Sequence, residues 1–316
     1  MEKNSKIYVA GHSGLVGSAL IRNLEKEGFT NIIVRTHAEL DLLDSAAVQA
    51  FFETEKPEYV FLAAAKVGGI VANNTCPVDF LQDNLRIQMN VIEWVYKTGT
   101  KKMLFLLSSC IYPKFSPQPI KEEYLLTGLL EATNEPYAIA KIAGLKLCQS
   151  YNRQYGTEFI ACMPTNLYGP YDNFDLESSH VLPAMIRKFH EAKINNLPNV
   201  TLWGDGSPFR EFLYSDDMAQ ACIHLMQNFS PTKEQNEKCD IYFNIGTGED
   251  ISIKNLGELV KKTVGYTGEI IWDTARPNGT PKKLLDVTKM QELGWKHSID
   301  LEDGIQISYD WYLNNL

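Results

Sequence analysis

A glycine-rich turn between a short apolar run and a helical pattern constrains the fold of this 316-residue chain more than any other feature. Residues 6–10 are β-prone, Gly11, Gly14 and Gly17 follow at regular intervals, and residues 18–27 have a helical pattern. Glycines in such a turn let the backbone approach a pyrophosphate, which then lies at the positive end of the helix. The spacing is G-x-x-G-x-x-G rather than G-x-G-x-x-G. The motif therefore indicates a dinucleotide site mainly through its position between this strand and this helix.

Short apolar strands alternate with helices through the first half of the chain. Strands are expected at 31–34, 59–65, 103–107 and 159–163, with helices ending at 52 and spanning 84–97. The alternation predicts an α/β protein with a doubly wound parallel Rossmann sheet and a smaller α/β substrate-binding lobe. We expect residues 1–170 to form the dinucleotide-binding domain, with 213–248 returning to it, and 171–212 and 249–316 to form the lobe. A ligand cleft is expected between the two parts.

Two finer expectations concern the second half of the chain. Residues 200–212 are expected to form a strand pair around the sequence Trp203-Gly-Asp-Gly206. The polar residues 230–239 are expected to form a mobile loop.

Composition limits the kinds of partner. The formal net charge of −9 argues against nucleic-acid binding and against an anionic membrane surface. The six cysteines are scattered without a Cys-x-x-Cys pair, so they are expected to be reduced thiols, and no metal site is predicted. The polar beginning of the chain fits neither a signal peptide nor a membrane span, which leads us to expect a cytoplasmic protein.

Tyr137 and Lys141 lie four residues apart in an Ala-rich run that Pro136 opens, so both side chains lie on one face of the predicted helix. A nearby ammonium favours the phenolate, at roughly 4 kcal/mol for a pair about 4 Å apart at an effective dielectric near 20. Such a tyrosine can pass a proton to a carbonyl oxygen as a hydride arrives at its carbon. Alone, the pair also fits an ordinary surface helix.

Ser108 follows the strand at 103–107 and adds a hydroxyl donor. Together with the glycine turn, the residues Ser108, Tyr137 and Lys141 indicate a hydride-transfer site.

The end of the second strand indicates which dinucleotide binds. NAD enzymes place an acidic residue there for the ribose hydroxyls, whereas an arginine accommodates a 2′-phosphate. Here Arg35 ends the strand, His37 follows, and the first acid is Glu39. This favours NADP(H), although Arg35 also fits a solvated residue on a loop.

Five blocks of sequence resemble the extended short-chain dehydrogenase/reductase family, and the resemblance covers almost the whole chain. They are residues 63–74, 108–113, 134–141, 163–170 and 203–213. They are most similar to the branch that converts GDP-4-keto-6-deoxy-D-mannose to GDP-L-fucose. The resemblance implies epimerisation at C3 and C5, reduction at C4 by NADPH, and a homodimer built by pairing helices.

The resemblance also implies roles for particular residues. Cys110 and His180 would be the acid/base pair of the epimerisation, and both residue types can exchange protons near working pH. Ser108 and Tyr137 would hold the oxygen at C4, with Lys141 steadying the phenolate. Without the resemblance, Cys110 would be a small buried hydrophobe and His180 a surface loop residue.

The resemblance also implies a set of cofactor-binding residues and a set of substrate-binding residues, some of which lie within the five blocks. Some relatives carry arginine where this chain has Ser13 and His37, which leaves Arg35 and His37 to contact the 2′-phosphate. Alone, the four substrate residues also fit core, solvated or turn positions. The cofactor set is Gly11, His12, Ser13, Gly14, Leu15, Val16, Gly17, Arg35, His37, Asp41, Leu42, Ala63, Ala64, Ala65, Leu106, Leu107, Ser108, Tyr137, Lys141, Pro164, Thr165, Asn166, Leu167 and His180, and the substrate set is Lys188, Trp203, Arg210 and Asn278.

Two other functions remain open at this point. One is a different nucleotide-sugar enzyme of the same fold, a 4-epimerase or a 4-ketoreductase, neither of which needs a Cys/His proton shuttle. The other is a non-catalytic NADP-sensing regulator. Such regulators typically lack the Tyr/Lys pair.

Overall fold

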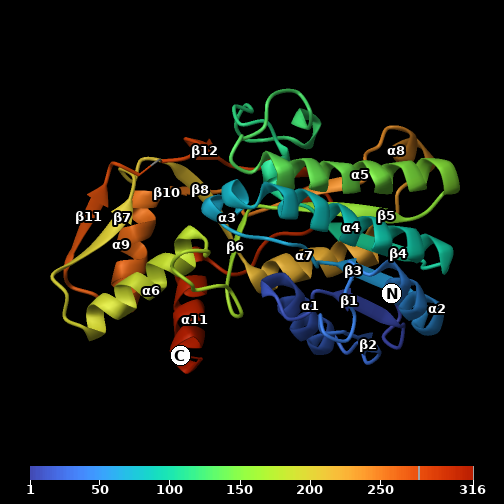
Figure 1. Ribbon diagram of the computed structural model, residues 1–316, viewed down its shortest axis with the longest axis horizontal. Helices are drawn as coiled ribbons and strands as arrows, with labels where there is room; N and C mark the ends of the chain where they lie inside the picture. The colour runs from blue at the N-terminus through green and yellow to red at the C-terminus, as the bar shows by residue number, and fades with distance from the viewer. Residues whose placement is uncertain (277, 316) are drawn as a thin grey trace.

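The computed structural model describes residues 1–276 and 278–315 and contains a six-stranded parallel sheet (Figure 1). The strand order is β2-β1-β3-β4-β5-β9, which confirms the predicted doubly wound α/β class. The strands are β1 (Ile7–Ala10), β2 (Ile32–Ile33), β3 (Tyr59–Leu62), β4 (Lys102–Leu106), β5 (Phe159–Pro164) and β9 (Tyr242–Ile245).

Helices cover both faces of this sheet. On one face α1 (Leu15–Lys26) packs against α7 (Ser215–Asn228), and on the other α4 (Pro77–Lys97) packs against α2 (Ser45–Glu55) and α5 (Glu135–Tyr155). Local sequence explains the helix ends. Asp44 caps α2 by accepting from two backbone N–H groups, and Gly156 ends α5 in the left-handed region.

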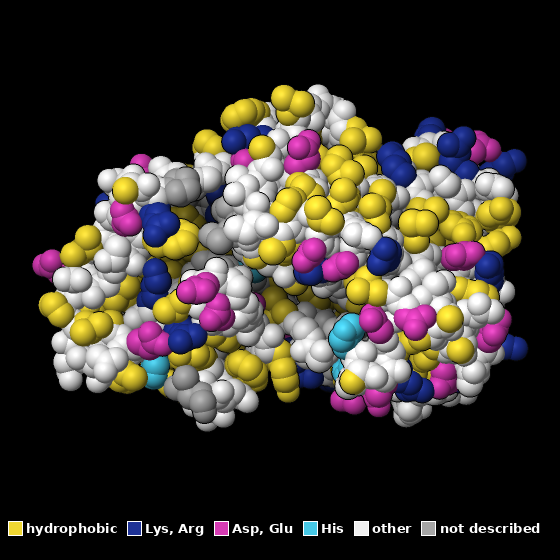
Figure 2. Space-filling view, viewed as in Figure 1, with side chains coloured by type: hydrophobic (Ala, Val, Ile, Leu, Met, Phe, Trp, Pro, Cys, Tyr) yellow, Lys and Arg dark blue, Asp and Glu magenta, His cyan; other side chains and the backbone are white. Residues whose placement is uncertain are grey.

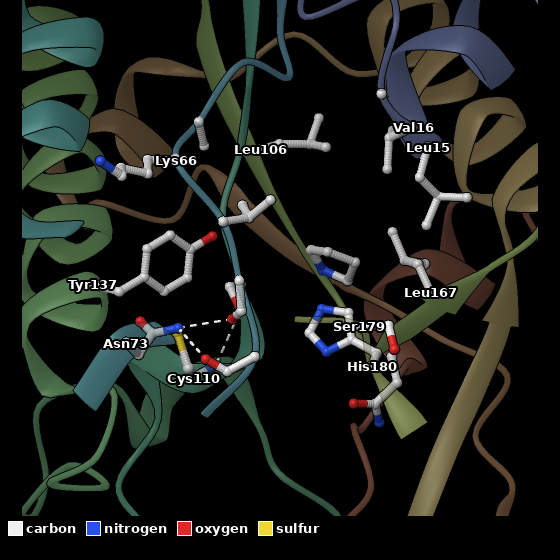
Figure 3. A pocket seen from close by; sticks show the side chains of 18 of the residues that line it. Leu15, Val16, Lys66, Asn73, Leu106, Cys110, Tyr137, Leu167, Ser179 and His180 are labelled. Carbon is white, nitrogen blue, oxygen red and sulfur yellow. Dashed lines mark hydrogen bonds between the residues drawn. The ribbon is translucent and has the colours of Figure 1, made fainter. Parts of the chain in front are cut away.

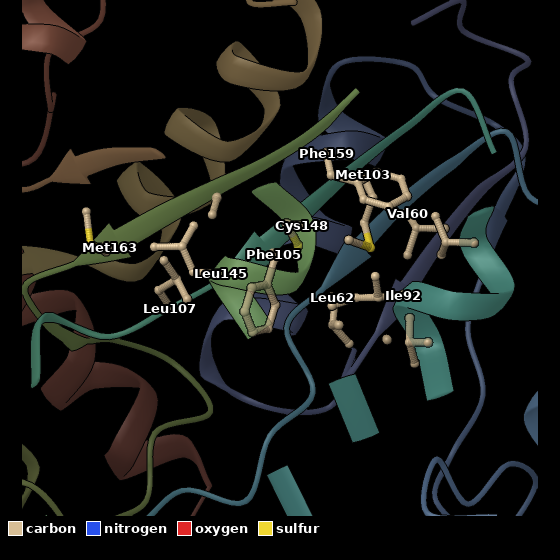
Figure 4. Close-up of a cluster of buried hydrophobic side chains, with 14 of the residues drawn as sticks. Val60, Leu62, Ile92, Met103, Phe105, Leu107, Leu145, Cys148, Phe159 and Met163 are labelled. Carbon is tan, nitrogen blue, oxygen red and sulfur yellow. The ribbon is translucent and has the colours of Figure 1, made fainter. Parts of the chain in front are cut away.

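Two apolar clusters fill the space between the sheet and its helices, because neighbouring strand residues point to opposite faces. Figure 4 shows the cluster on the α4 and α5 side, where Leu62 and Phe105 from the strands lie near Ile92 of α4 and Leu145 of α5. The helices that carry candidate site residues are thereby packed directly against the strands.

The smaller part of the fold lies at the left of Figure 1 and is organised around one strand. β8 (Phe209–Tyr214) pairs with β6 (Asn166–Tyr168), β10 (Asp250–Ser252) and β12 (Lys282–Lys283). A separate parallel pair is formed by β7 (Asn199–Trp203) and β11 (Glu269–Asp273). A third apolar cluster joins these strands to α6 (Val181–Ile194), α9 (Ile253–Val264) and α11 (Leu301–Asn314).

The remaining elements are short. They are α3 (Ile70–Thr75), η1 (Ser109–Ile111), η2 (Glu122–Tyr124), α8 (Lys233–Glu237) and α10 (Thr288–Glu292).

The structure corrects two of the sequence-based expectations. Residues 200–212 do contain parts of two strands, but these strands do not pair with each other. β7 pairs with β11, and β8 pairs with β6 and other strands, so the partners of both strands are distant in sequence. Residues 230–239 include helix α8, which a capping box between Thr232 and Gln235 stabilises. The proposed division into domains stays a prediction, although β9 does join the main sheet.

Over the described residues, no helix is both long enough and apolar enough to cross a membrane. In the same ranges, no group of three or more His, Cys, Asp or Glu side chains is arranged to hold a metal ion.

Candidate active site

A cavity of about 1000 Å³ opens at the carboxyl ends of the parallel strands, between the main sheet and the smaller lobe. The register brings these strand ends together, since Ala10 pairs with Leu62, Leu62 with Phe105 and Leu106 with Cys162. Every catalytic, cofactor-binding and substrate-binding residue predicted from the sequence lines this cavity. The individual roles of these residues stay predictions.

The glycine turn forms one end of the cavity, and its three glycines differ in what surrounds them. Gly11 has a φ of +86°, and a Cβ there would lie 2.7 Å from the backbone N of Ala64. A Cβ on Gly17 would lie 1.9 Å from the carbonyl oxygen of Gly11, so this glycine permits close contact between helix and turn. At Gly14 the nearest atom would be that same oxygen, at 3.7 Å. The open side of Gly14, at the uncapped N-terminus of α1, fits a pyrophosphate.

Arg35, at the expected 2′-phosphate position, is already partly engaged. Its Nη2 lies 2.6 Å from a Glu55 carboxylate oxygen, and its Nη1 donates to the Val34 carbonyl at 2.8 Å. Glu39 accepts from the backbone N and the hydroxyl of Thr36 and is not among the residues that line the cavity. The first acid after the strand is therefore not positioned for ribose hydroxyls, which agrees with a cofactor that carries a 2′-phosphate.

The side chains expected to handle the ketone come from the end of β4 and from α5. Ser108 caps η1, and its Oγ accepts from the backbone N of Cys110 at 3.4 Å, which leaves its O–H free to donate. Lys141 is 3% exposed, and its Nζ donates to the Leu106 carbonyl at 2.8 Å. The same Nζ lies 5.8 Å from the centroid of the Tyr137 ring.

The direction in which the pKa of Tyr137 is shifted differs from the sequence-based expectation. We expected the Lys141 ammonium to favour the phenolate and so to lower the pKa of Tyr137, whereas its Nζ donates a hydrogen bond to the Leu106 carbonyl. Burial raises the pKa of Tyr137 and lowers the pKa of Lys141 to about 8. Tyr137 therefore holds its proton and is ready to donate it.

Cys110 and His180 line the cavity together, from η1 and from the residue that precedes α6. Figure 3 shows Cys110 and Tyr137 on one side of the cavity and His180 on the other. Burial raises the pKa of the Cys110 thiol, which a nearby Lys283 partly offsets. His180 is accessible from the cavity, but the enclosing walls, together with Lys283, lower its pKa. Both groups are therefore neutral near pH 7, as a thiol and an imidazole.

Cationic and aromatic side chains gather in the part of the cavity that the lobe forms. Arg210 on β8 and Lys283 on β12 occupy paired positions, and burial lowers the pKa of each. Lys188 lies 5.9 Å from the Trp203 ring centroid, and its Nζ donates to a backbone carbonyl. Asn278 lines the cavity and also accepts from the backbone N of Asp205, so it has a structural role in a turn as well.

Sequence reasoning missed several residues of the cavity. Lys283 comes from a short strand without a motif of its own, so no local signal could have identified it. Asn73, Asn134 and Ser179 each present a buried side-chain oxygen that has no hydrogen-bond partner within the described part of the chain. Asn73 and Asn134 belong to blocks that resemble the family, which was the one available signal.

Comparison with known proteins gives consistent results. A family model described as "NAD dependent epimerase/dehydratase family" matches residues 7–246. The chain is 57% identical to "Putative GDP-L-fucose synthase 2" of Arabidopsis thaliana, over 100% of this chain and 94% of that protein. It is 53% identical to "GDP-L-fucose synthase" of Escherichia coli (strain K12), over 98% and 97% of the two chains. Among solved structures, "MlghC, GDP-mannoheptose C4 reductase from Campylobacter jejuni with NADP bound" is similar with a TM-score of 0.90 at 44% identity, over 99% of each chain.

Substitution of two glycines in the turn should separate folding from cofactor binding. Gly17→Ala forces a Cβ into the Gly11 carbonyl and should lower the free energy of unfolding by about 3 kcal/mol. Gly14→Ala meets no close atom, so its stability should change by at most about 1 kcal/mol. It should nevertheless weaken NADPH binding roughly tenfold, because the methyl group occupies the space left for the pyrophosphate.

The measurements are urea unfolding and an NADPH fluorescence titration of each variant. Unchanged NADPH affinity in Gly14→Ala would show that the dinucleotide does not bind along this turn.

Proposed function

The chain belongs to the NAD dependent epimerase/dehydratase family, and on that premise we propose that it converts GDP-4-keto-6-deoxy-D-mannose to GDP-L-fucose with NADPH. The enzyme would be bifunctional, a 3,5-epimerase and a 4-reductase. Similarity to GDP-L-fucose synthases over nearly the whole chain supports this activity, as expected from the sequence. The observation that carries the proposal is that a single cavity holds the reductase set Ser108, Tyr137 and Lys141 together with the pair Cys110 and His180.

Epimerisation can use the neutral forms of both groups in the pair. C3 and C5 flank the ketone, so removal of a proton from either carbon gives an enolate whose oxygen Ser108 and Tyr137 can stabilise. Inversion requires one group to take a proton and another to return it from the opposite face. Cys110 and His180 lie on opposite sides of the cavity, and as thiol and neutral imidazole they hold one transferable proton and one basic nitrogen.

Reduction uses the same donors. NADPH, when bound, supplies the hydride for C4. Tyr137 donates its proton to the oxygen, and the Lys141 ammonium stabilises the phenolate that remains. Because Tyr137 is neutral before reaction, it can donate without prior proton uptake.

The lobe supports binding of the GDP portion. Arg210 and Lys283 would neutralise the diphosphate, since a guanidinium can bind phosphate oxygens through two N–H groups and an ammonium adds a point charge. Trp203 is 49% exposed and offers a flat aromatic surface in the same cavity. Lys188 lies beside that ring.

A simple 4-ketoreductase is the second candidate, because one similar structure is described as a GDP-sugar C4 reductase. A reductase alone has no use for a proton-shuttling pair, and the position of Cys110 and His180 in this cavity favours the bifunctional enzyme. The Tyr/Lys pair at the same site disfavours a non-catalytic regulator.

A homodimer and a cytoplasmic location complete the proposal. An apolar stripe on α4 contains Leu81, Leu85 and Met89, and one on α5 contains Ile139 and Ala143, at helical spacing. Met89 is 57% exposed and Ile139 is 42% exposed. Figure 2 shows apolar side chains gathered over these helices, as expected of a surface that packs against a second copy. The cytoplasmic location stays a prediction.

Cys110→Ser tests the epimerase. A serine hydroxyl is a far weaker acid than a thiol, so solvent deuterium incorporation at C3 and C5 should fall by about 10²-fold or more. NADPH affinity should be unchanged. The assay incubates the enzyme with the 4-keto sugar in D₂O and analyses the product by NMR. Cys76→Ser, at an exposed cysteine, is the matched control. A wild-type product without deuterium at either carbon would favour the 4-ketoreductase.

The pH profile tests the role of Lys141. The proposed mechanism needs Lys141 as an ammonium. The value of kcat/KM should therefore be constant below the Lys141 pKa of about 8 and should fall as the pH rises through it. Lys141→Arg keeps its charge at alkaline pH, so the decline near pH 8 should disappear even if the rate is lower. The measurement is NADPH oxidation between pH 6 and 10 with both proteins. The same alkaline decline in the arginine variant would contradict this role.

Charged substitutions in the apolar stripes test the dimer. Met89→Glu and Ile139→Glu should each shift the protein from dimer to monomer in sedimentation velocity, because a buried, unpaired carboxylate opposes association. Ile194→Glu, at an exposed apolar position at the end of α6, should leave the dimer intact. A monomeric wild-type protein, or a dimer that survives both substitutions, would rule out this interface.

A further inference from the structure

Asn73 carries a buried hydrogen-bond acceptor at the wall of the cavity, and two bonds fix the orientation of its amide. The residue lies on α3, is 5% exposed and lines the cavity. Its Nδ2 donates to the carbonyl of Gly68 at 2.7 Å and to that of Gly69 at 3.0 Å. Rotation of the amide would place its oxygen against these two carbonyl oxygens, so the orientation is determined by the bonds. Its Oδ1 has no partner among the described residues.

The segment that holds Asn73 connects both halves of the proposed catalytic site. A Cβ on Gly68 would lie 3.0 Å from the Phe80 ring, and that ring packs edge-to-face against Tyr137 with centroids 6.3 Å apart. On the other side, the backbone N of Gly69 donates to the Ser178 carbonyl at 3.3 Å, close to His180. Figure 3 shows Asn73 on the same side of the cavity as Cys110 and Tyr137, with His180 opposite. Asn73 therefore lies on the wall of the cavity that carries Cys110 and Tyr137, two of the groups that would move protons.

A buried acceptor without a partner is costly, so a ligand that supplies a donor at this place is stabilised. The inference that follows rests on the proposed function. The reaction inverts C3 and C5 of the hexose, and of these two carbons only C3 carries a hydroxyl, whereas C5 carries a methyl group and the ring oxygen. We propose that the Oδ1 of Asn73 binds the substrate by accepting a hydrogen bond from its 3-hydroxyl group.

This contact would help to determine the stereochemistry at C3. Inversion moves the 3-hydroxyl to the other face of the ring, whereas the Oδ1 is held in place by the bonds to Gly68 and Gly69. A fixed acceptor can therefore bind the hydroxyl well in one configuration of C3 only. Asn73 is in this sense a specificity residue of the epimerase, and reduction at C4 does not depend on it directly.

Asn73→Ala tests the inference with two substrates, the GDP-4-keto-6-deoxy hexose and its 3-deoxy analogue. Loss of the acceptor should lower kcat/KM for NADPH oxidation with the 3-hydroxy substrate about tenfold or more, because the hydroxyl is left unpaired. With the 3-deoxy analogue the same substitution should change the rate less than about twofold, since no hydroxyl is present to lose its partner. Asn74→Ala is the matched control, because Asn74 is the next residue of α3, is exposed and is not among the cavity residues.

Solvent exchange with the 3-hydroxy substrate gives a second readout in the same variant. Deuterium incorporation at C3 should slow by about tenfold more than incorporation at C5. If the substitution only disturbed α3, it would lower the exchange rates at C3 and C5, and kcat/KM for both substrates, by the same factor. That result would overturn the inference. Wild-type protein that neither exchanges these protons nor oxidises NADPH would refute the proposed function itself, and so the two failures are distinguishable.

Discussion

The hydrogen bond between the buried Lys141 ammonium and the Leu106 carbonyl is the interaction on which the rest of the site depends. A lysine that is 3% exposed needs a polar partner, since an unpaired buried charge is strongly unfavourable. The partner, Leu106, is the last residue of β4, and the segment that follows this strand contains Ser108 and Cys110. The bond therefore sets α5, and Tyr137 with it, beside the end of that strand. One interaction positions both the donors for the ketone and the thiol.

A buried carboxylate connects this site to the lobe in a comparable way. Glu211 on β8 is fully buried, and its side chain accepts from the backbone N of Leu285 at 2.9 Å and of Gly248 at 2.8 Å. Its backbone carbonyl accepts from the side chains of Thr165 and Asn166, which belong to the predicted cofactor-binding set. Desolvation raises the pKa of Glu211, and the backbone donors oppose that rise. Through these bonds Glu211 holds the segments that carry Arg210 and Lys283 against the main sheet.

Local sequence patterns predicted the parts of the protein whose structure is determined locally. The glycine turn, the Tyr-x-x-x-Lys helix and the parallel sheet follow from spacing and hydrophobic periodicity, and the structure has all three. The partner of β7 and the position of Lys283 depend on residues distant in sequence, so no local pattern could reveal them. The shift in the pKa of Tyr137 was expected in the opposite direction, because the sequence shows the spacing of two residues but not the burial around them. The roles of the individual cavity residues rest on the family resemblance and stay predictions.

The central claim is that one set of donors stabilises negative charge on the C4 oxygen during both epimerisation and reduction. A crystal structure with NADP⁺ and the GDP-sugar bound tests it most directly, through the distance from the Tyr137 hydroxyl to that oxygen. We predict a distance of about 2.7 Å, with Ser108 donating to the same oxygen and the nicotinamide ring facing C4. A Tyr137 hydroxyl out of hydrogen-bond range of the sugar oxygen, with another group in its place, would contradict the account.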